Sequence, residues 1–97
     1  MLVRVLTMRV APERLDDWLR FTRDVGFPGM RRQPGCHGIW RLRKHGTECE
    51  WEIVTLWQSV ADLEQFRASD AMRELSAVAA ELTVPPHHET LFDVFED

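Results

Sequence analysis

Four tryptophans in a chain of 97 residues are its most distinctive source of binding chemistry. Their large rings can stack on a flat aromatic ligand, and they can equally fill the core of a small protein. Trp57 poses the question most sharply, because it ends a strand-like run in "TLWQS" directly before a helix. A plug between strand and helix is the favoured interpretation, and the wall of a small-molecule pocket is the alternative.

The four histidines supply the other candidate chemistry. His88 could act as a general base, since an imidazole with a near-neutral pKa suits proton abstraction from a phenol or hydroquinone. His45, His87 and His88 are expected near Cys49 at one end of a sheet. Their spacing matches no zinc pattern, and strand order separates His88 from Cys49, so we expect exposed histidines and no metal site.

Alternating apolar residues predict the strands that position these groups. Four are expected, at residues 2–10, 37–44, 48–57 and, in "ETLFDVF", 89–95. With a helix between the first two strands and another between the last two, the order is β-α-β-β-α-β. This order predicts a single ferredoxin-like α+β domain over residues 1–97. Its four-stranded antiparallel sheet has the order 4-1-3-2, with both helices on one face.

Capping signals place the two helices. The first begins at Pro12 and is expected to loosen within "GFPGM". The surrounding segment 23–35 is either a mobile lid over a cavity or an ordinary connection. The second helix has Ser59 as its N-cap, restarts at Ser69 and ends at the two prolines of 85–86.

A tight turn in "KHGT" is expected to join the second and third strands. Arg43 would then face Glu48, and Arg41 would face Glu50, so opposite charges would lie across the pair. In this register Trp40 lies opposite Trp51. The core side of the hairpin would carry Trp40, Leu42, Cys49, Trp51, Ile53 and Trp57.

The other face of the sheet is left uncovered in this arrangement. The third strand places Val54 and Leu56 there, and the first strand is apolar on both faces. An exposed apolar sheet face is typical of an interface, and a chain this short gains much from a partner. We therefore expect a homodimer that packs sheet on sheet.

Composition excludes several classes of partner. The net charge is −4, so nothing attracts a nucleic acid backbone. No run of apolar residues reaches membrane length, and the N-terminus alternates and carries Arg4 and Arg9, unlike a signal peptide. A cytoplasmic location is expected, with Cys36 and Cys49 as free thiols.

The residues that lead into the second helix resemble a known family. The run "LWQS", followed by Leu63 and Ser69, and the turn "QPGC" are similar to the strand-end Trp, the caps and the Pro-Gly turn of the antibiotic biosynthesis monooxygenase (ABM) family. The resemblance implies a dimeric α/β barrel. Such families include cofactor-free oxygenases of reduced polycyclic aromatics, haem-degrading enzymes and members without known activity.

The chain departs from the family pattern at positions where members carry reactive groups. Thr55 stands where Glu is common, and Phe66 and Ala71 stand where His is common. The place of an inward amide holds Ile53, and the chain contains no Asn or Tyr. Residues 59–82 contain no His to hold haem iron, so haem degradation is the least expected of the family activities.

These considerations predict a small-molecule monooxygenase that acts on a planar aromatic or quinol-like substrate without metal, flavin or other cofactor. The expected cavity residues are Trp57, Trp40, Trp51, Ile53 and Phe66, with Thr55 as a hydroxyl donor and His88 as the base. The alternative is a non-catalytic homodimer that binds a small ligand, serves a regulatory partner or is purely structural.

Overall fold

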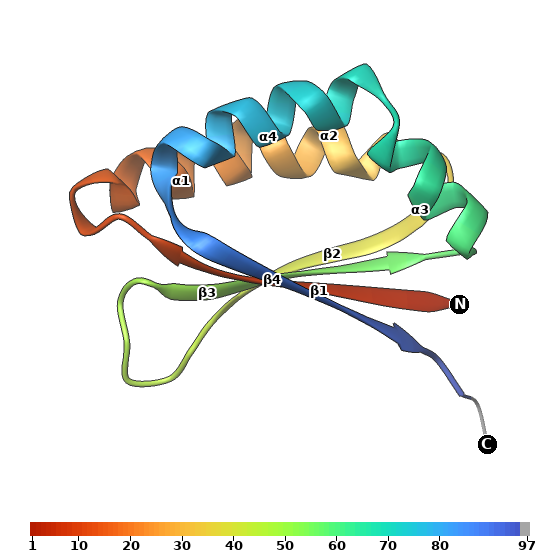
Figure 1. Cartoon of the computed structure of the whole chain (residues 1–97), viewed down its shortest axis with the longest axis horizontal. Coiled ribbons are helices and arrows are strands. Elements are labelled where there is room, and N and C mark those ends of the chain that lie inside the picture. The colour runs from red at the N-terminus through yellow and green to blue at the C-terminus, as the bar shows by residue number, and fades with distance from the viewer. Residues whose placement is uncertain (96–97) are drawn as a thin grey trace.

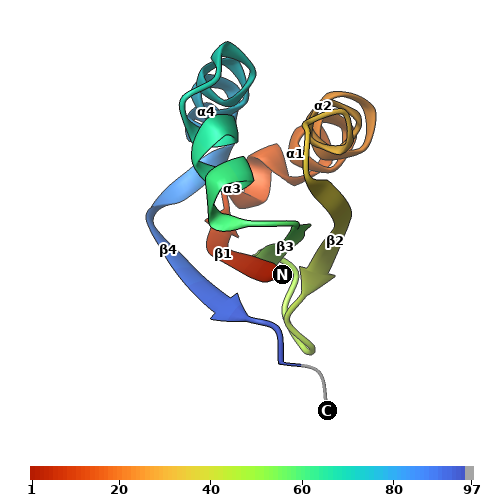
Figure 2. The same ribbon diagram turned by 90° about the vertical axis from the view of Figure 1, so that its right-hand side faces the viewer.

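The computed structural model describes residues 1–95. Its strands and helices follow in the order β1 (Leu2–Val10), α1 (Leu15–Phe21), α2 (Phe27–Arg31), β2 (Cys36–Arg43), β3 (Glu50–Trp57), α3 (Val60–Arg67), α4 (Asp70–Leu82) and β4 (Thr83–Asp93). The sheet order is β2-β3-β1-β4 with antiparallel neighbours, which confirms the predicted topology. All helices cover one face of the sheet, with α3 and α4 beside α1 and α2 (Figures 1 and 2).

The first helical stretch is continuous through the segment expected to loosen. A 3₁₀ turn at Pro12–Arg14 leads into α1, and a π-helical turn at Thr22–Gly26 joins α1 to α2. Pro28 lies directly after the π-helical turn, in the first turn of α2. Residues 23–31 are therefore helical and the chain does not break there, while a lid over 23–35 stays a prediction.

The second helical stretch follows the predicted caps. The Ser59 hydroxyl accepts a hydrogen bond from the Asp62 amide, and the Ser69 hydroxyl accepts one from Met72. The helix ends at Leu82 rather than at the prolines, and β4 begins at once. Prolines 85 and 86 are tolerated inside β4 because it is an edge strand, which leaves one row of amides unpaired.

The predicted register of the β2–β3 hairpin is wrong. Arg43 lies opposite Trp51 and Arg41 opposite Ile53. The expected turn at 44–47 forms, with the Thr47 amide donating to the Lys44 carbonyl at 3.1 Å and Gly46 at a φ of +83°, but it lies within a longer connection over 44–49. This shift reverses the faces of β2, so that Ile39 is buried in the core and Trp40 is half exposed on the open face. A cross-strand ion pair contributes only ~0.2–1 kcal/mol, whereas burial of an Ile contributes about 1.5–3 kcal/mol.

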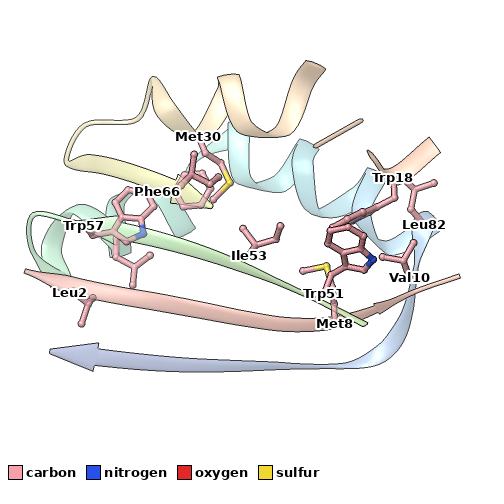
Figure 3. Close-up of a cluster of buried hydrophobic side chains, with 12 residues drawn as sticks. Leu2, Met8, Val10, Trp18, Met30, Trp51, Ile53, Trp57, Phe66 and Leu82 are labelled. Carbon is pink, nitrogen blue, oxygen red and sulfur yellow. The ribbon is translucent and has the colours of Figure 1, made fainter. Parts of the chain in front are cut away.

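The core lies between the helices and the sheet. Trp51, Ile53, Thr55 and Trp57 alternate along β3 toward this side and are all buried, as the sequence predicts. Figure 3 shows the large side chains gathered at the two ends of the core, with Ile53 between them. The candidate site lies between these two groups of large side chains.

Candidate functional site

A cavity of about 100 Å³ lies between the helical layer and the sheet. Ile53 contributes to it from β3, and Phe66 comes from α3. Trp18 lines it from α1, at the opposite end of the core in Figure 3. Methionines and leucines supply much of the remaining wall, namely Leu6, Met8, Met30, Met72 and Leu75. The cavity is thus an apolar space between two aromatic clusters.

Trp57 packs against Phe66, which lines the cavity. Its side chain is fully buried, and its ring stacks on Phe66 with centroids 5.2 Å apart. The indole Nε1 donates a hydrogen bond of 2.8 Å to the Thr55 hydroxyl. Because Phe66 rather than Trp57 lines the cavity, this geometry fits the plug between strand and helix.

Trp18 and Trp51 form the second aromatic cluster, with ring centroids 5.1 Å apart. The Arg41 guanidinium lies 5.8 Å from the Trp18 centroid and 5.7 Å from the Trp51 centroid, within cation–π range. Its Nη1 donates to the Leu19 carbonyl and to the Thr22 hydroxyl at 3.0 and 2.7 Å. Sequence reasoning placed Arg41 on the solvated face because the hairpin register was wrong.

Three polar residues reach the cavity lining, namely Arg4, Thr22 and Ser76. The Thr22 hydroxyl is committed to the Trp18 and Leu19 carbonyls and to Arg41. The Ser76 hydroxyl contacts the Met72 sulfur at 3.6 Å, a weak acceptor. Ser76 and Arg4 are therefore the polar groups best able to bind a ligand in the cavity.

Arg4 belongs to an ion network at the β4 edge. Its Nε donates to Glu89 at 2.6 Å, and Arg67 from α3 donates to the other oxygen of the same carboxylate. Burial alone would raise the pKa of Glu89. The hydrogen bonds and positive charges of Arg4 and Arg67 outweigh that effect and hold the pKa below its usual value.

His88 and Trp40 do not join this cavity. Both lie on the open face, where His88 pairs with Thr7 and Trp40 with Val54. His88 contributes to a wide hollow of about 670 Å³ near the 44–49 loop. Of the side chains expected to act together, the structure brings Ile53 and Phe66 to the cavity and places Trp57, Thr55 and Trp51 in the packing around it.

A separate groove of about 380 Å³ runs along the outer side of the helical layer, between the two helical stretches. Arg32 and Gln33 line it from one side and Glu74 from the other. Phe21 and Leu75 line both this groove and the inner cavity. These two apolar side chains therefore lie between the cavity and the groove.

Comparison with known proteins places this architecture in a family. The sequence model for antibiotic biosynthesis monooxygenases matches residues 1–78. The chain belongs to the ABM family. No curated protein matches this ABM chain in sequence.

Solved structures share the fold of this ABM protein over nearly its whole length. A putative antibiotic biosynthesis monooxygenase from Bordetella bronchiseptica is 21% identical, covering 98% of this chain and 97% of its own with a TM-score of 0.86. One from Caulobacter crescentus is 18% identical, covering 98% and 90% with a TM-score of 0.86. A mutant of SnoaB, a cofactor-independent oxygenase from Streptomyces nogalater, is 16% identical, covering 99% and 94% with a TM-score of 0.83. At these identities the likeness shows the fold alone.

The described part of this ABM chain also bears on metals, thiols and membranes. Residues 1–95 contain no group of three or more His, Cys, Asp or Glu side chains arranged to hold a metal ion. Both cysteines are free thiols, as expected from the sequence. No helix within the same residues is long and apolar enough to span a bilayer.

Proposed function

We propose that this ABM protein is a cofactor-independent monooxygenase that acts on a small planar aromatic, quinol-like substrate in the helix–sheet cavity. The observation that carries the proposal is the apolar cavity between two aromatic clusters, in a chain of a monooxygenase family. A cofactor-independent oxygenase shares this fold. Apolar cavities with a few polar groups are the usual sites for such ligands.

The size of the cavity determines how a substrate would enter. About 100 Å³ is close to the scale of one aromatic ring, since an engineered cavity of about 150 Å³ binds benzene. Displacement of Phe21 and Leu75 would join the cavity to the outer groove, and the two volumes together lie within the range of ligand pockets, about 300–1,000 Å³. The flexible Met30 and Met72 and the π-helical turn at Thr22–Gly26 favour such an opening.

The proposed chemistry takes its electrons from the substrate. A reduced aromatic substrate, once deprotonated, donates electrons to O₂. One oxygen atom then enters the substrate and the other leaves as water. The protein would hold the ring against Phe66 and Ile53 and exclude bulk water, while Trp57 and Thr55 keep Phe66 in place. His88 lies on the other face of the sheet, so it does not serve as the base in this cavity.

A non-catalytic role is the second candidate function, and one observation favours it. Among residues 1–95, the cavity lining holds no carboxylate or imidazole to act as a general base. The same cavity could then bind a planar ligand without transforming it, in a regulatory or structural homodimer. Oxygen consumption distinguishes the two functions.

We also propose that the protein is a homodimer through the open face of its sheet, and that it is cytoplasmic. Trp40, Leu42 and Phe92 are each about half exposed on this face, and Val54 and Leu56 lie between them on β3. Gly38 supports this surface, because a Cβ there would clash with the Trp40 ring. A second copy is the simplest cover for a sheet face of this composition.

Ligand binding and oxygen uptake test the proposed function with one pair of variants. Ala79→Leu puts a larger apolar side chain into the cavity from α4, while Ala77→Leu makes the same change on the exposed side of that helix. Naphthohydroquinones and anthrones would be titrated by calorimetry and by Trp fluorescence, with O₂ uptake measured at saturation. We expect binding to weaken at least about tenfold in Ala79→Leu and to stay within about twofold of wild type in Ala77→Leu.

Each result separates the candidates. Uptake of O₂ that Ala79→Leu abolishes and Ala77→Leu retains would support the monooxygenase. Saturable binding without O₂ uptake would favour the non-catalytic ligand-binding role. Equal binding by both variants would place the ligand outside this cavity and overturn the proposal.

A further inference from the structure

Arg4 is the most deeply buried charged residue described, at 6% exposed, and the one charged side chain among the cavity lining within residues 1–95. It lies on the core side of β1, opposite Thr55 on β3 and Leu91 on β4. Its hydrogen bond to the described residues uses Nε, so the N–H groups of Nη1 and Nη2 have no acceptor within that part of the chain. These Nη groups are not among the buried side-chain atoms that lack a partner within residues 1–95, so they reach accessible space, where guanidinium N–H groups can donate to a ligand oxygen.

The surroundings of Arg4 contain more donors than acceptors. Glu89 from β4 is shared between Arg4 and Arg67 from α3. Glu64, also on α3, lies 3.5 Å from Arg67 but is largely exposed to solvent, where its charge is screened. The Arg67 Nε is buried without a partner within the described residues. The network therefore has hydrogen-bond capacity for a further anionic oxygen.

Within residues 1–95, neither β3 nor α4 contributes a negative charge to the cavity lining beside Arg4. From β3 the neighbour is the Thr55 hydroxyl, which accepts from Trp57. From α4 the polar cavity residue is Ser76, which is exposed and whose hydroxyl contacts the Met72 sulfur. Both groups are uncharged, so the repulsion that an anionic ligand meets comes from Glu89, whose single charge is outweighed by those of Arg4 and Arg67.

We propose that Arg4 binds an oxygen anion of the substrate, so that the cavity selects acidic phenols, enols and hydroquinones in their deprotonated form. This inference rests on the proposed function and narrows its substrate class. A cation a few ångströms from a bound phenol favours the phenolate, and in an apolar cavity the effect is larger than in water. Arg4 would thereby hold the substrate in the form that reacts with O₂, which lowers the need for a strong base in the cavity.

The ionisation of a bound chromogenic phenol tests this inference. 4-Nitrophenol carries one aromatic ring, and its absorbance changes when it ionises near neutral pH. Titration of the wild-type protein at a series of pH values measures the affinities of both forms. We expect 4-nitrophenolate to bind about tenfold or more tightly than neutral 4-nitrophenol, which is a decrease of one pKa unit or more for the bound dye.

Variants at Arg4 and Arg9 of β1 and at Glu89 of β4 separate the effect of the Arg4 charge on dye binding from the effect of the cavity shape. Arg4→Met should reverse the preference, because an apolar cavity favours the neutral dye. Arg9→Met changes an exposed arginine of β1 and should retain the wild-type preference. Glu89→Gln keeps an acceptor for Arg4 and removes the counter-charge, so it should strengthen the preference for the anion. This variant keeps the test decisive if Arg4→Met does not fold.

The outcomes also distinguish this inference from the proposed function. If 4-nitrophenol binds, and Ala79→Leu blocks it, but the neutral form is preferred by wild type, the cavity is real and the role of Arg4 is wrong. An unchanged preference in Glu89→Gln would contradict the charge argument as well. If neither the dye nor the quinols bind, the proposed function fails and this inference fails with it.

Discussion

At the scale of single residues, Glu89 shows how charge and burial oppose each other. Burial raises its pKa, but the paired Arg4 and Arg67 bring it below the usual value, so the folded protein binds a proton at Glu89 less readily than the unfolded chain. A lowered folded-state pKa contributes stability above the unfolded value near 4.5, and this contribution is lost as pH falls through the folded value.

We therefore predict a weaker acid dependence of stability in Glu89→Gln. Its Tm should be about 4–8 °C below wild type near neutral pH, as for a loss of ~1 kcal/mol in a domain of this size, and the gap should narrow below about pH 4. Thermal unfolding by circular dichroism over this pH range measures the difference. A constant gap at every pH would show that the Glu89 charge contributes nothing, and Glu74→Gln on exposed α4 is the control.

A substitution at Trp57 tests whether this residue is a plug between strand and helix or a wall of the ligand cavity. Trp57→Phe removes the hydrogen bond to Thr55 and reduces stacking on Phe66, so we expect a loss of about 1–3 kcal/mol in the free energy of unfolding. Ligand affinity should change less than about threefold, because Trp57 does not line the cavity. Urea unfolding and calorimetry measure the two quantities. A large loss of affinity with little loss of stability would restore the wall interpretation.

At the scale of elements, Gly35 is critical to the turn that joins α2 to β2. Its φ is +82°, and a Cβ there would clash with Asp62, which follows the Ser59 cap of α3. Its carbonyl also accepts from the Gln58 amide at 2.8 Å. This residue thus couples the start of β2 to the start of α3.

We expect Gly35→Ala to lower the free energy of unfolding by about 2 kcal/mol or more, because strain and overlap both oppose it. Gly29→Ala is the matched control. Gly29 lies in α2 with open space around its Cα, so Ala there should stabilise the protein by about 0.5–1 kcal/mol. Opposite signs in urea unfolding would support the argument, and equal effects would contradict it.

At the scale of the whole molecule, the proposed dimer depends on the open sheet face. Trp40→Glu would place like charges from two copies in one interface, so we expect the dissociation constant to rise at least about a hundredfold. Val60→Glu, on a similarly exposed apolar residue of α3, should leave it unchanged. Sedimentation equilibrium measures both. A wild-type protein that is monomeric at high concentration would overturn the dimer.

Much of the fold was predictable because its signals are local. The alternation in β1 and β3 and the caps Ser59 and Ser69 depend on neighbouring residues, and they determine the order of elements and the sheet topology. The aromatic core side of β3, including Trp57, follows from the same alternation. The ABM resemblance rests on these residues, and the family match confirms it.

The site depends on distances between elements, and these could not be read from one chain segment. The observed hairpin register differs from the predicted one, so Trp40 lies on the open face and Arg41 lies against Trp18. The difference exchanges the two faces of β2, because successive side chains in a strand point to opposite faces. Arg4 looks like an ordinary polar residue in the alternation of β1. By itself the sequence determined which elements form and in what order. Only the tertiary structure decided which side chains share a cavity. Packing between the helices and the sheet selects the register of β2 on β3, and it buries the Arg4 charge beside its partner Glu89.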